Sequence, residues 1–355
     1  MHENQHIIDA PDGPPMNIAD YRILRTRAGF IAAEDRGWIA VAGHDRADFL
    51  QGLLSNDVVA LSPGAGCYAV CLTPQGRMTA DMYVLAQPDR LLLDVDRGVA
   101  DRLRERFDDL VFTEDVRVAD LSAGSAGFGV HGPAAREVAE ALTGPAAGAM
   151  APCAHRVLEI GTAAGWVART DDLGIEGYRV VVERAAAEAL QRALEAAGAV
   201  AVDRTAAEAV RVESGRPAYP IDMDHDTIPL EAGIADRAIS FDKGCYVGQE
   251  VIIRILHRGQ GRIARRLVGL TLGRRDGAEP APPPRGAAIF SGGADVGRVT
   301  SAVRSPALGG VIALGYLRRE LADAGGASVE VSSGTERVPA TVTPLPFVPP
   351  ADRAV

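Results

Sequence analysis

Phe241-Asp242-Lys243-Gly244-Cys245-Tyr246-Val247-Gly248-Gln249-Glu250 is the most informative segment of the sequence. Gly244 and Gly248 allow the backbone to turn tightly and to approach another surface closely. Lys243 is the only lysine of the chain, whose other basic positions are arginine. A thiol two residues from an ammonium, in an accessible turn, is expected to react as a thiolate. Cys245 is therefore a candidate reactive residue, with Lys243 beside it; the alternative is a buried thiol that only packs.

Strand and helix patterns alternate on the N-terminal side of this segment. The first set predicts strands at 38–41, 68–72, 78–85, 91–95 and 116–120, with helices at 45–56 and 99–110. A second set predicts strands at 128–131, 157–160, 166–169 and 178–182, together with further helices. Two strands that follow one another between helices are typical of a split βαβ unit. The fold class predicted for this part is α+β, with two ferredoxin-like or split βαβ units.

The sequence pattern changes on the C-terminal side of this segment. Short β-type runs at 267–272, 287–290, 297–303, 311–316 and 338–343 are separated by Gly and Pro, which predicts a small antiparallel β-barrel. The predicted domains are a flexible arm at 1–20, a first α+β unit at 21–125, a second unit at 126–260 that carries the quoted segment, and the barrel at 261–350. Residues 249–256 stay open between helix and strand, because Gln-Glu favours a helix start and Val-Ile-Ile favours β-structure.

Composition excludes several classes of protein. The chain has 355 residues, 47% of them hydrophobic, and a net charge of −10, which argues against a disordered chain and against broad binding to nucleic acid or anionic membrane. No apolar run reaches the roughly 18 residues of a membrane span, and the N-terminus lacks the features of a secretory signal. We therefore expect a cytoplasmic protein.

The four cysteines do not have the spacing of a metal site. Cys67 and Cys71 fall four residues apart on a predicted strand, about 13 Å from one another, so they can neither bridge nor chelate together. The seven histidines show no zinc spacing either. The sequence thus predicts no resident metal and mostly buried, reduced thiols apart from Cys245.

Lys-Gly-Cys-Tyr-Val-Gly-Gln-Glu at 243–250 resembles the signature of the YgfZ-type folate-binding proteins, which are GcvT-like relatives of the aminomethyltransferases. Four further stretches resemble motifs of that family in the same order along the chain. These are Asp45–Gly52 with Ser55-Asn56-Asp57-Val58, Leu72–Arg77 followed by Asp81, Arg211–Pro217, and Gly297–Ser301 with Ser305-Pro306.

The resemblance implies a tripartite GcvT-like fold around tetrahydrofolate or a one-carbon derivative of it. It implies that Glu213 holds the pterin ring and that Asp81 lies near the reactive folate nitrogens. A carboxylate can accept the paired N–H groups of a pterin, which agrees with this assignment. From the residues alone, Glu213 could equally be an exposed helix-end charge and Asp81 a solvent-facing strand residue. The other expected cofactor-binding residues lie in or beside the matching motifs: Asn56, Tyr68, Arg211, Tyr246 and Arg254.

A local basic stretch adds one expectation about partners. Residues 251–300 contain nine arginines against three acidic residues, in a chain that is acidic as a whole. Such a patch suits a small polyanion, for example a polyglutamylated folate tail or a short contact with RNA, and a solvated surface is the alternative. Within this stretch, Arg254 and Arg258 are the arginines nearest the signature.

The leading hypothesis is a tetrahydrofolate-binding factor that supports assembly or repair of iron–sulfur clusters in client proteins, including tRNA-modifying enzymes. Cys245 would then be a reactive thiol or a transient cluster ligand. The alternatives are a folate-dependent aminomethyl or methyl transferase that uses Asp81, and a non-catalytic folate-binding interaction module. Catalytic candidates are thus Cys245, Lys243 and Asp81.

Overall fold

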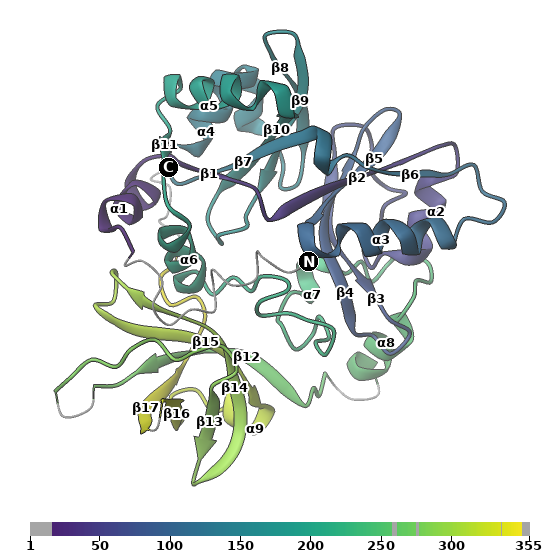
Figure 1. Cartoon of the computed structure of the whole chain (residues 1–355). Helices are drawn as coiled ribbons and strands as arrows, with labels where there is room; N and C mark the ends of the chain where they lie inside the picture. The colour runs from purple at the N-terminus through teal and green to yellow at the C-terminus, as the bar shows by residue number, and fades with distance from the viewer. Residues whose placement is uncertain (1–15, 258–260, 275–276, 335, 350–355) are drawn as a thin grey trace.

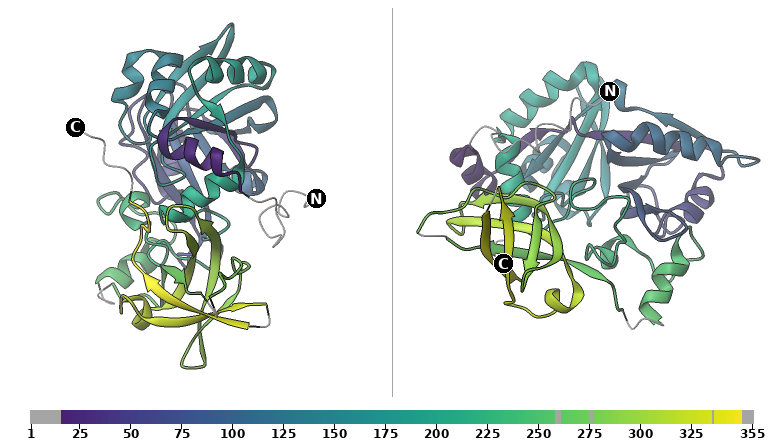
Figure 2. Two further views of the ribbon diagram at one scale, coloured as in Figure 1. Left: turned by 90° about the vertical axis from the view of Figure 1, so that its left-hand side faces the viewer. Right: turned by 60° about the horizontal axis from the view of Figure 1, so that its bottom comes forward.

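The computed structural model describes residues 16–257, 261–274, 277–334 and 336–349, and these residues form three lobes (Figure 1). Two lobes are β-sheets with helices, and the third is a barrel. In both views of Figure 2 the barrel is a lobe distinct from the two sheets. Arg258 and most of the arm predicted at 1–20 lie outside the described residues, and the last residues of the arm begin a helix. The α+β prediction with a C-terminal barrel is confirmed.

The first sheet has the order β3-β4-β5-β2-β6, with antiparallel neighbours. Its apolar inner positions pack against two helices, as the helical spacing of leucines in the sequence predicts. The strands and helices of this lobe are β2 (Arg36–Ala42), α2 (Arg46–Leu53), β3 (Gly66–Leu72), β4 (Met78–Ala86), β5 (Arg90–Asp96), α3 (Arg97–Asp109) and β6 (Arg117–Asp120).

The second sheet has the order β11-β1-β7-β10-β9-β8. Its strands are β1 (Gly29–Ala32), β7 (Ser125–His131), β8 (His155–Ile160), β9 (Ala163–Thr170), β10 (Gly177–Glu183) and β11 (Val200–Ala201). Two helices pack on it, α4 (Ala135–Thr143) and α5 (Ala187–Ala196), with short 3-10 turns at Ser122–Gly124, Pro145–Ala149 and Arg184–Ala186. The strand β1 lies between β7 and β11, so a segment that the sequence places in the unit at 21–125 belongs to the second sheet.

The barrel closes in the order β12-β15-β14-β13-β16-β17 around a core rich in Val, Leu and Ala. Its elements are β12 (Arg265–Leu272), β13 (Ala288–Ser291), β14 (Ala294–Ser305), β15 (Gly310–Arg318), α9 (Arg319–Ala322), β16 (Ser328–Ser333) and β17 (Glu336–Thr343). Closure pairs every strand edge, which is how such a short chain segment avoids an exposed edge.

Four helices connect the lobes: α1 (Ile18–Thr26), α6 (Arg204–Glu213), α7 (Ala235–Ala238) and α8 (Gln249–His257). The helix α6 lies between the second sheet and the barrel (Figure 1). The open question at 249–256 is thereby answered, because this stretch is helical. Its apolar residues share one face and Ile252 is buried, so helical packing outweighs the β-preference of Val-Ile-Ile. None of the described helices combines the length and apolar character of a membrane span.

Candidate functional site

Asp81 and Tyr68 form the centre of the candidate site, on the paired strands β3 and β4. Tyr68 lies opposite Tyr83 and Val70 lies opposite Asp81, so Tyr68 and Asp81 are diagonal neighbours across the pair. The Tyr68 hydroxyl donates a hydrogen bond of 2.6 Å to Oδ2 of Asp81. The other oxygen, Oδ1, is buried and has no hydrogen-bond partner among the described residues. A buried acceptor left open in this way is suited to a ligand that donates an N–H or O–H.

Burial also changes the acidity of this carboxyl group. It raises the pKa of Asp81 above its ordinary value of 3.8, against the opposing effects of Arg36 and of the Tyr68 hydrogen bond. The charged form is disfavoured because the site offers it little solvation. Asp81 therefore holds a proton more readily than an exposed aspartate does, which is a property of general acids and bases.

Arg237 on α7 connects this pair to a turn of the second sheet. Its guanidinium lies 3.9 Å from the ring centroid of Tyr68, which is cation–π geometry. It donates a hydrogen bond of 2.8 Å to Asp171, and the hydroxyl of Tyr83 donates one of 2.9 Å to the same oxygen. Asp171 follows directly after β9. One arginine thus connects both sheets to the aromatic side chains next to Asp81.

A second charge network lies beside the first. Arg179 on β10 contacts Asp94 at 3.1 Å and Asp172 at 2.6 Å, and Arg36 on β2 contacts Asp94 at 2.7 Å. Burial would raise the pKa of Asp172, but the charges of Arg179 and Arg36 outweigh it and hold that pKa at about 2. Asp172 is thus a fixed negative charge in the same network as Asp81, and it adds to the upward shift of the Asp81 pKa.

His131 is the buried histidine of this region. Burial lowers its pKa to about 4, with Arg179 acting in the same direction and Asp172 against it. Its Nδ1 is buried and has no hydrogen-bond partner among the described residues. The imidazole is therefore neutral at pH 7, and its Nδ1 atom can take a further hydrogen-bond partner.

We call these residues the Asp81 cluster: Asp81, Tyr68, Tyr83, Asp171, Asp172 and Arg237. It combines two aromatic rings, 5.4 Å apart between centroids, with carboxylates and a guanidinium. Aromatic faces bind flat heterocycles, and carboxylates accept hydrogen bonds from ring N–H groups. The arrangement suits a planar, nitrogen-rich ligand and can move a proton at Asp81.

Lys243 has a different location from the one expected of a catalytic residue. Its Nζ donates hydrogen bonds of 2.7, 2.7 and 2.8 Å to the backbone carbonyls of Gln51, Leu54 and Asn56. All three ammonium hydrogens are therefore committed to the end of α2 and the turn that follows. Burial lowers the pKa of Lys243 to about 8. The structure supports an anchoring role for this lysine, and it gives a physical reason why arginine does not replace it here.

The segment around Cys245 is held in place by this lysine. Cys245 itself is exposed, whereas Tyr246 is buried, with its ring centroid 5.2 Å from the Lys243 ammonium. Gly248 has φ of +86°, and a Cβ there would lie 2.6 Å from the carbonyl oxygen of Thr73. The glycine thus allows the close approach that the sequence predicts.

Asn56 lies at the candidate site, whereas Arg254 lies at the surface. The Asn56 amide donates to the carbonyls of Tyr68 and Arg237, at 2.9 and 3.2 Å, so it holds β3 against α7 at the Asp81 cluster. Arg254 is on the exposed face of α8 and pairs with Glu250 one turn away. Asn56 therefore supports the site, and Arg254 lies at the surface with a local partner.

Glu213 lies at the junction between α1, α6 and the barrel, fully buried. Its carboxylate pairs with Arg25 and accepts hydrogen bonds from the hydroxyls of Tyr21 and Ser305. Both oxygens are engaged by the protein, so the alternative of an exposed helix-end charge is excluded. The pterin-holding role that the resemblance implies would require breaking a buried ion pair, and it stays a prediction.

Arg211, two residues before Glu213 on α6, has a similar structural environment. It is buried and contacts Glu208, Asp222 and the hydroxyl of Ser301 on β14. Desolvation of the guanidinium is compensated by the two carboxylates. This arginine fastens the barrel to the rest of the chain and is likewise left outside the Asp81 cluster.

The sequence analysis does not single out Arg237, Tyr83, Asp171 or Asp172. Arg237 belongs to a four-residue helix, and Asp171-Asp172 looks like an ordinary polar turn after a strand. A possible signal is the aspartate pair directly after a strand, where loop residues often carry function. No group of three or more His, Cys, Asp or Glu in the described ranges is arranged to hold a metal ion.

Two family models match almost the whole chain. The GCVT N-terminal domain model matches residues 14–243, and the glycine cleavage T-protein C-terminal barrel domain model matches residues 265–349. The chain belongs to the glycine cleavage T-protein family. The first model spans both sheets of this T-protein family member, including β1 and the Asp81 cluster, and the second spans the barrel.

Curated relatives support this membership. The chain is 32% identical over 332 residues to an aminomethyltransferase from Rubrobacter xylanophilus, covering 93% of this chain and 85% of the relative. It is 29% identical over 330 residues to an aminomethyltransferase from Thermosynechococcus vestitus, covering 93% and 87%. Among solved structures, the aminomethyltransferase T of the glycine cleavage system from Bartonella henselae superposes with a TM-score of 0.81 at 22% identity, covering 93% of this chain and 89% of that one. The T-protein fold is therefore shared over all three lobes.

Proposed function

We propose that the chain binds a reduced folate at the Asp81 cluster and transfers a one-carbon unit carried by that folate. The observation that carries the proposal is the buried Asp81 carboxyl group, with one oxygen bonded to Tyr68 and the other without a partner. Membership in the T-protein family and the aminomethyltransferase relatives support it.

The residues of the Asp81 cluster fit tetrahydrofolate. A pterin ring is flat and carries adjacent N–H donors, which match the rings of Tyr68 and Tyr83 and the unpartnered Oδ1 of Asp81. Tetrahydrofolate would supply ring and side-chain nitrogens that carry a one-carbon group. The chain itself supplies the enclosure and the acid–base chemistry.

Each side chain has a role that follows from its contacts. Asp81 would hold or release a proton at its unpartnered oxygen, because burial raises the pKa of its carboxyl group. Tyr68 orients that carboxyl through its hydroxyl. Arg237 fixes the Tyr68 ring from one face and joins it to Asp171.

Two measurements test this proposal. Calorimetric titration with tetrahydrofolate should show binding, and formation of one-carbon-loaded tetrahydrofolate from an aminomethyl donor should show turnover. Replacing Asp81 by Asn keeps the shape but removes the proton-transfer group, so we expect a loss of about 10²-fold or more in turnover. Asp89→Asn, at the surface in the turn between β4 and β5, is the matched control and should leave turnover unchanged. An Asp81→Asn protein with full turnover would contradict the proposal.

A second function has its own supporting observation. Cys245 is exposed at the end of a turn that Lys243 anchors, while the other three thiols are not exposed. The resemblance of 243–250 to the YgfZ-type signature supports a tetrahydrofolate-binding factor for iron–sulfur client proteins, tRNA-modifying enzymes among them. One thiolate cannot hold a four-cysteine cluster alone, so any cluster would be shared with the client.

Two different variants distinguish the two proposed functions. In the maintenance function, Cys245→Ser abolishes support of an iron–sulfur client enzyme but leaves tetrahydrofolate affinity and one-carbon turnover unchanged. In the transferase function, only Asp81→Asn reduces turnover. A non-catalytic folate-binding module would show binding with no turnover in the unmodified chain.

A further inference from the structure

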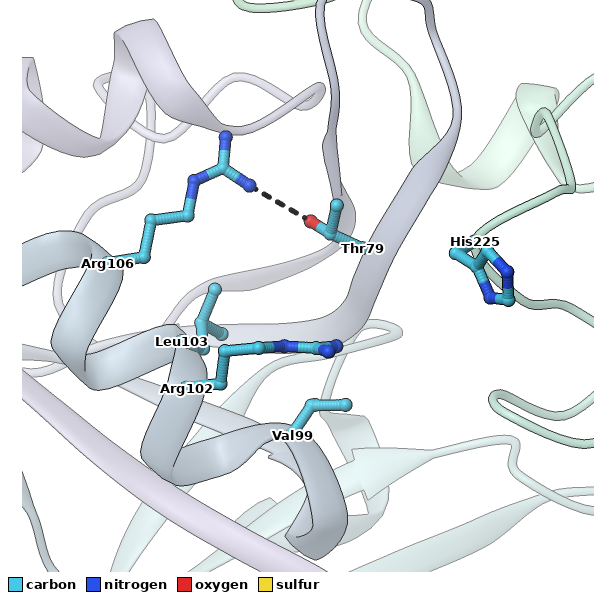
Figure 3. Close-up of a pocket in the computed structure, with 6 residues that line it drawn as sticks. All are labelled: Thr79, Val99, Arg102, Leu103, Arg106 and His225. Atoms are coloured by element: carbon cyan, nitrogen blue, oxygen red, sulfur yellow. Dashed lines mark hydrogen bonds between the residues drawn. The ribbon is translucent and has the colours of Figure 1, made fainter.

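A pocket of about 290 Å³ lies beside helix α3 of the first lobe, and none of its lining residues belongs to the Asp81 cluster. Its lining comes from α3, from the start of β4 and from the turn that carries His225 (Figure 3). Val99 and Leu103 provide apolar surface. Arg102, Arg106, Thr79 and His225 provide polar groups, so one small space combines an apolar part with a cationic part.

The positive charge of this pocket is not neutralised by neighbouring carboxylates. Arg102 is exposed and makes no hydrogen bond or ion pair with any residue in the described ranges. Within the described part of the chain, Arg106 donates only to neutral oxygens, the Thr79 hydroxyl and the Leu72 carbonyl, both at 3.3 Å. By contrast, Arg104 on the same helix pairs with Asp108. Two guanidiniums one helical turn apart thus share a pocket without a counter-charge.

Two acidic side chains close in sequence to the lining residues have partners elsewhere among the described residues. Asp226, next to His225, forms an ion pair of 3.0 Å with Arg77. Asp96 accepts a hydrogen bond of 2.8 Å from the Gly98 backbone at the N-terminus of α3. In a chain with a net charge of −10, uncompensated arginines in a pocket are a specific attraction for an anion.

We propose that this pocket binds a small ligand with a dianionic head, such as a phosphate monoester, and a short apolar body. The head would be held by Arg102 and Arg106, because guanidinium groups match phosphate oxygens in a paired geometry. The body would contact Val99 and Leu103. This site is separate from the Asp81 cluster and does not depend on the proposed function.

Thr79, which lines the pocket, also contacts other parts of the chain. Thr79 and Asp81 are two residues apart on β4, and the Tyr219 hydroxyl donates a hydrogen bond of 2.8 Å to the Thr79 carbonyl. An anion at Arg106 would compete with the Thr79 hydroxyl for the guanidinium that now donates to it.

Phenyl phosphate is the probe that tests this site, with calorimetry on the full chain. We expect phenyl phosphate to bind, benzoate to bind more weakly because its head carries one charge, and neutral benzyl alcohol not to bind. Arg102→Gln should weaken phenyl phosphate binding about tenfold or more, the usual value of a charge-assisted contact. Arg102 is exposed, so the variant should keep its fold, which circular dichroism checks.

Arg104→Gln is the matched control, since Arg104 is on the same helix but outside the pocket and should have no effect on binding. Equal affinity of the Arg102→Gln protein and the unmodified chain would overturn the proposal. Equal affinity for inorganic phosphate and phenyl phosphate would also overturn it, because the apolar surface would then contribute nothing.

Discussion

The Tyr68 hydroxyl donates a 2.6 Å hydrogen bond to one oxygen of Asp81, while the other oxygen of that carboxyl group has no partner among the described residues. This asymmetry fixes the orientation of the carboxyl group and leaves one acceptor in a buried position. A carboxyl group held in this way can bind a donor and exchange a proton without first reorganising.

Removing the Tyr68 hydroxyl should change the pH dependence of turnover. In Tyr68→Phe the carboxylate loses the hydrogen bond that favours its charged form, so the pKa of Asp81 rises further. We expect the acidic limb of the pH–rate profile to move to higher pH, with the protein still folded. A profile identical to that of the unmodified chain would show that Asp81 does not titrate during turnover.

The four thiols should differ in their reaction with iodoacetamide under native conditions. Cys245 is exposed, whereas burial raises the pKa of Cys67 to about 12 and that of Cys153 to about 11, and Cys71 is buried. Mass spectrometry of the labelled protein should find the label on Cys245 first. Cys245→Ser should then take up almost no label until denaturant is added. Early labelling of Cys67 would contradict this order.

Replacing Lys243 should destabilise the fold without a direct effect on the Asp81 cluster. In Lys243→Met, three backbone carbonyls lose their donor, which we expect to cost roughly 3 kcal/mol in the free energy of unfolding. Lys243→Arg should not restore stability, because a planar guanidinium cannot donate in the directions that an ammonium does. Urea unfolding of both variants measures this, and a fully stable arginine variant would refute the anchoring role.

His131 should make the fold less stable as the pH falls. Its pKa is about 4 when folded against 6.5 when exposed, so below pH 6.5 the unfolded chain binds a proton that the folded chain does not. Stability is therefore lost between pH 6.5 and about 4, by up to about 3 kcal/mol in total. His131→Gln should flatten this part of the pH profile of unfolding, and a profile that this substitution leaves unchanged would contradict the prediction.

Glu213 should matter for stability and not for folate affinity. Glu213→Gln leaves Arg25 without its counter-charge in a buried junction, for which we expect a loss of roughly 3 kcal/mol. Glu188→Gln, at an exposed ion pair, should cost less than about 1 kcal/mol. If Glu213→Gln instead weakened tetrahydrofolate binding with stability intact, Glu213 would hold the pterin as the resemblance implies.

Local patterns in the sequence predict much of this fold. The barrel follows from Gly and Pro between short β-type runs, and α3 follows from the spacing of Val99, Leu103 and Phe107, all of which are buried. These signals are local because the periodicity of one element is encoded in its own residues. The membership of β1 in the second sheet is not local, since its partners come from residues 125–131 and 200–201.

In the candidate site, too, some residues are predicted from local motifs and others are found only in the tertiary structure. Asp81 and Tyr68 are predicted from motifs and are found as neighbours, but Arg237 and Asp171 reach them only through the tertiary structure. Glu213 illustrates the opposite case. Its motif is read correctly as a helix end, but only the packing of α1 and the barrel reveals that Arg25 and Ser305 already occupy its carboxylate.

The placement of β1 links the two sheets in a way that affects any attempt to divide the chain. A fragment that starts after β6 would lack the strand that separates β7 from β11, and its partner fragment would carry that strand unpaired. Neither half is then a self-sufficient folding unit. The sheets should become native together, and co-expressed halves should recombine where separately purified ones aggregate.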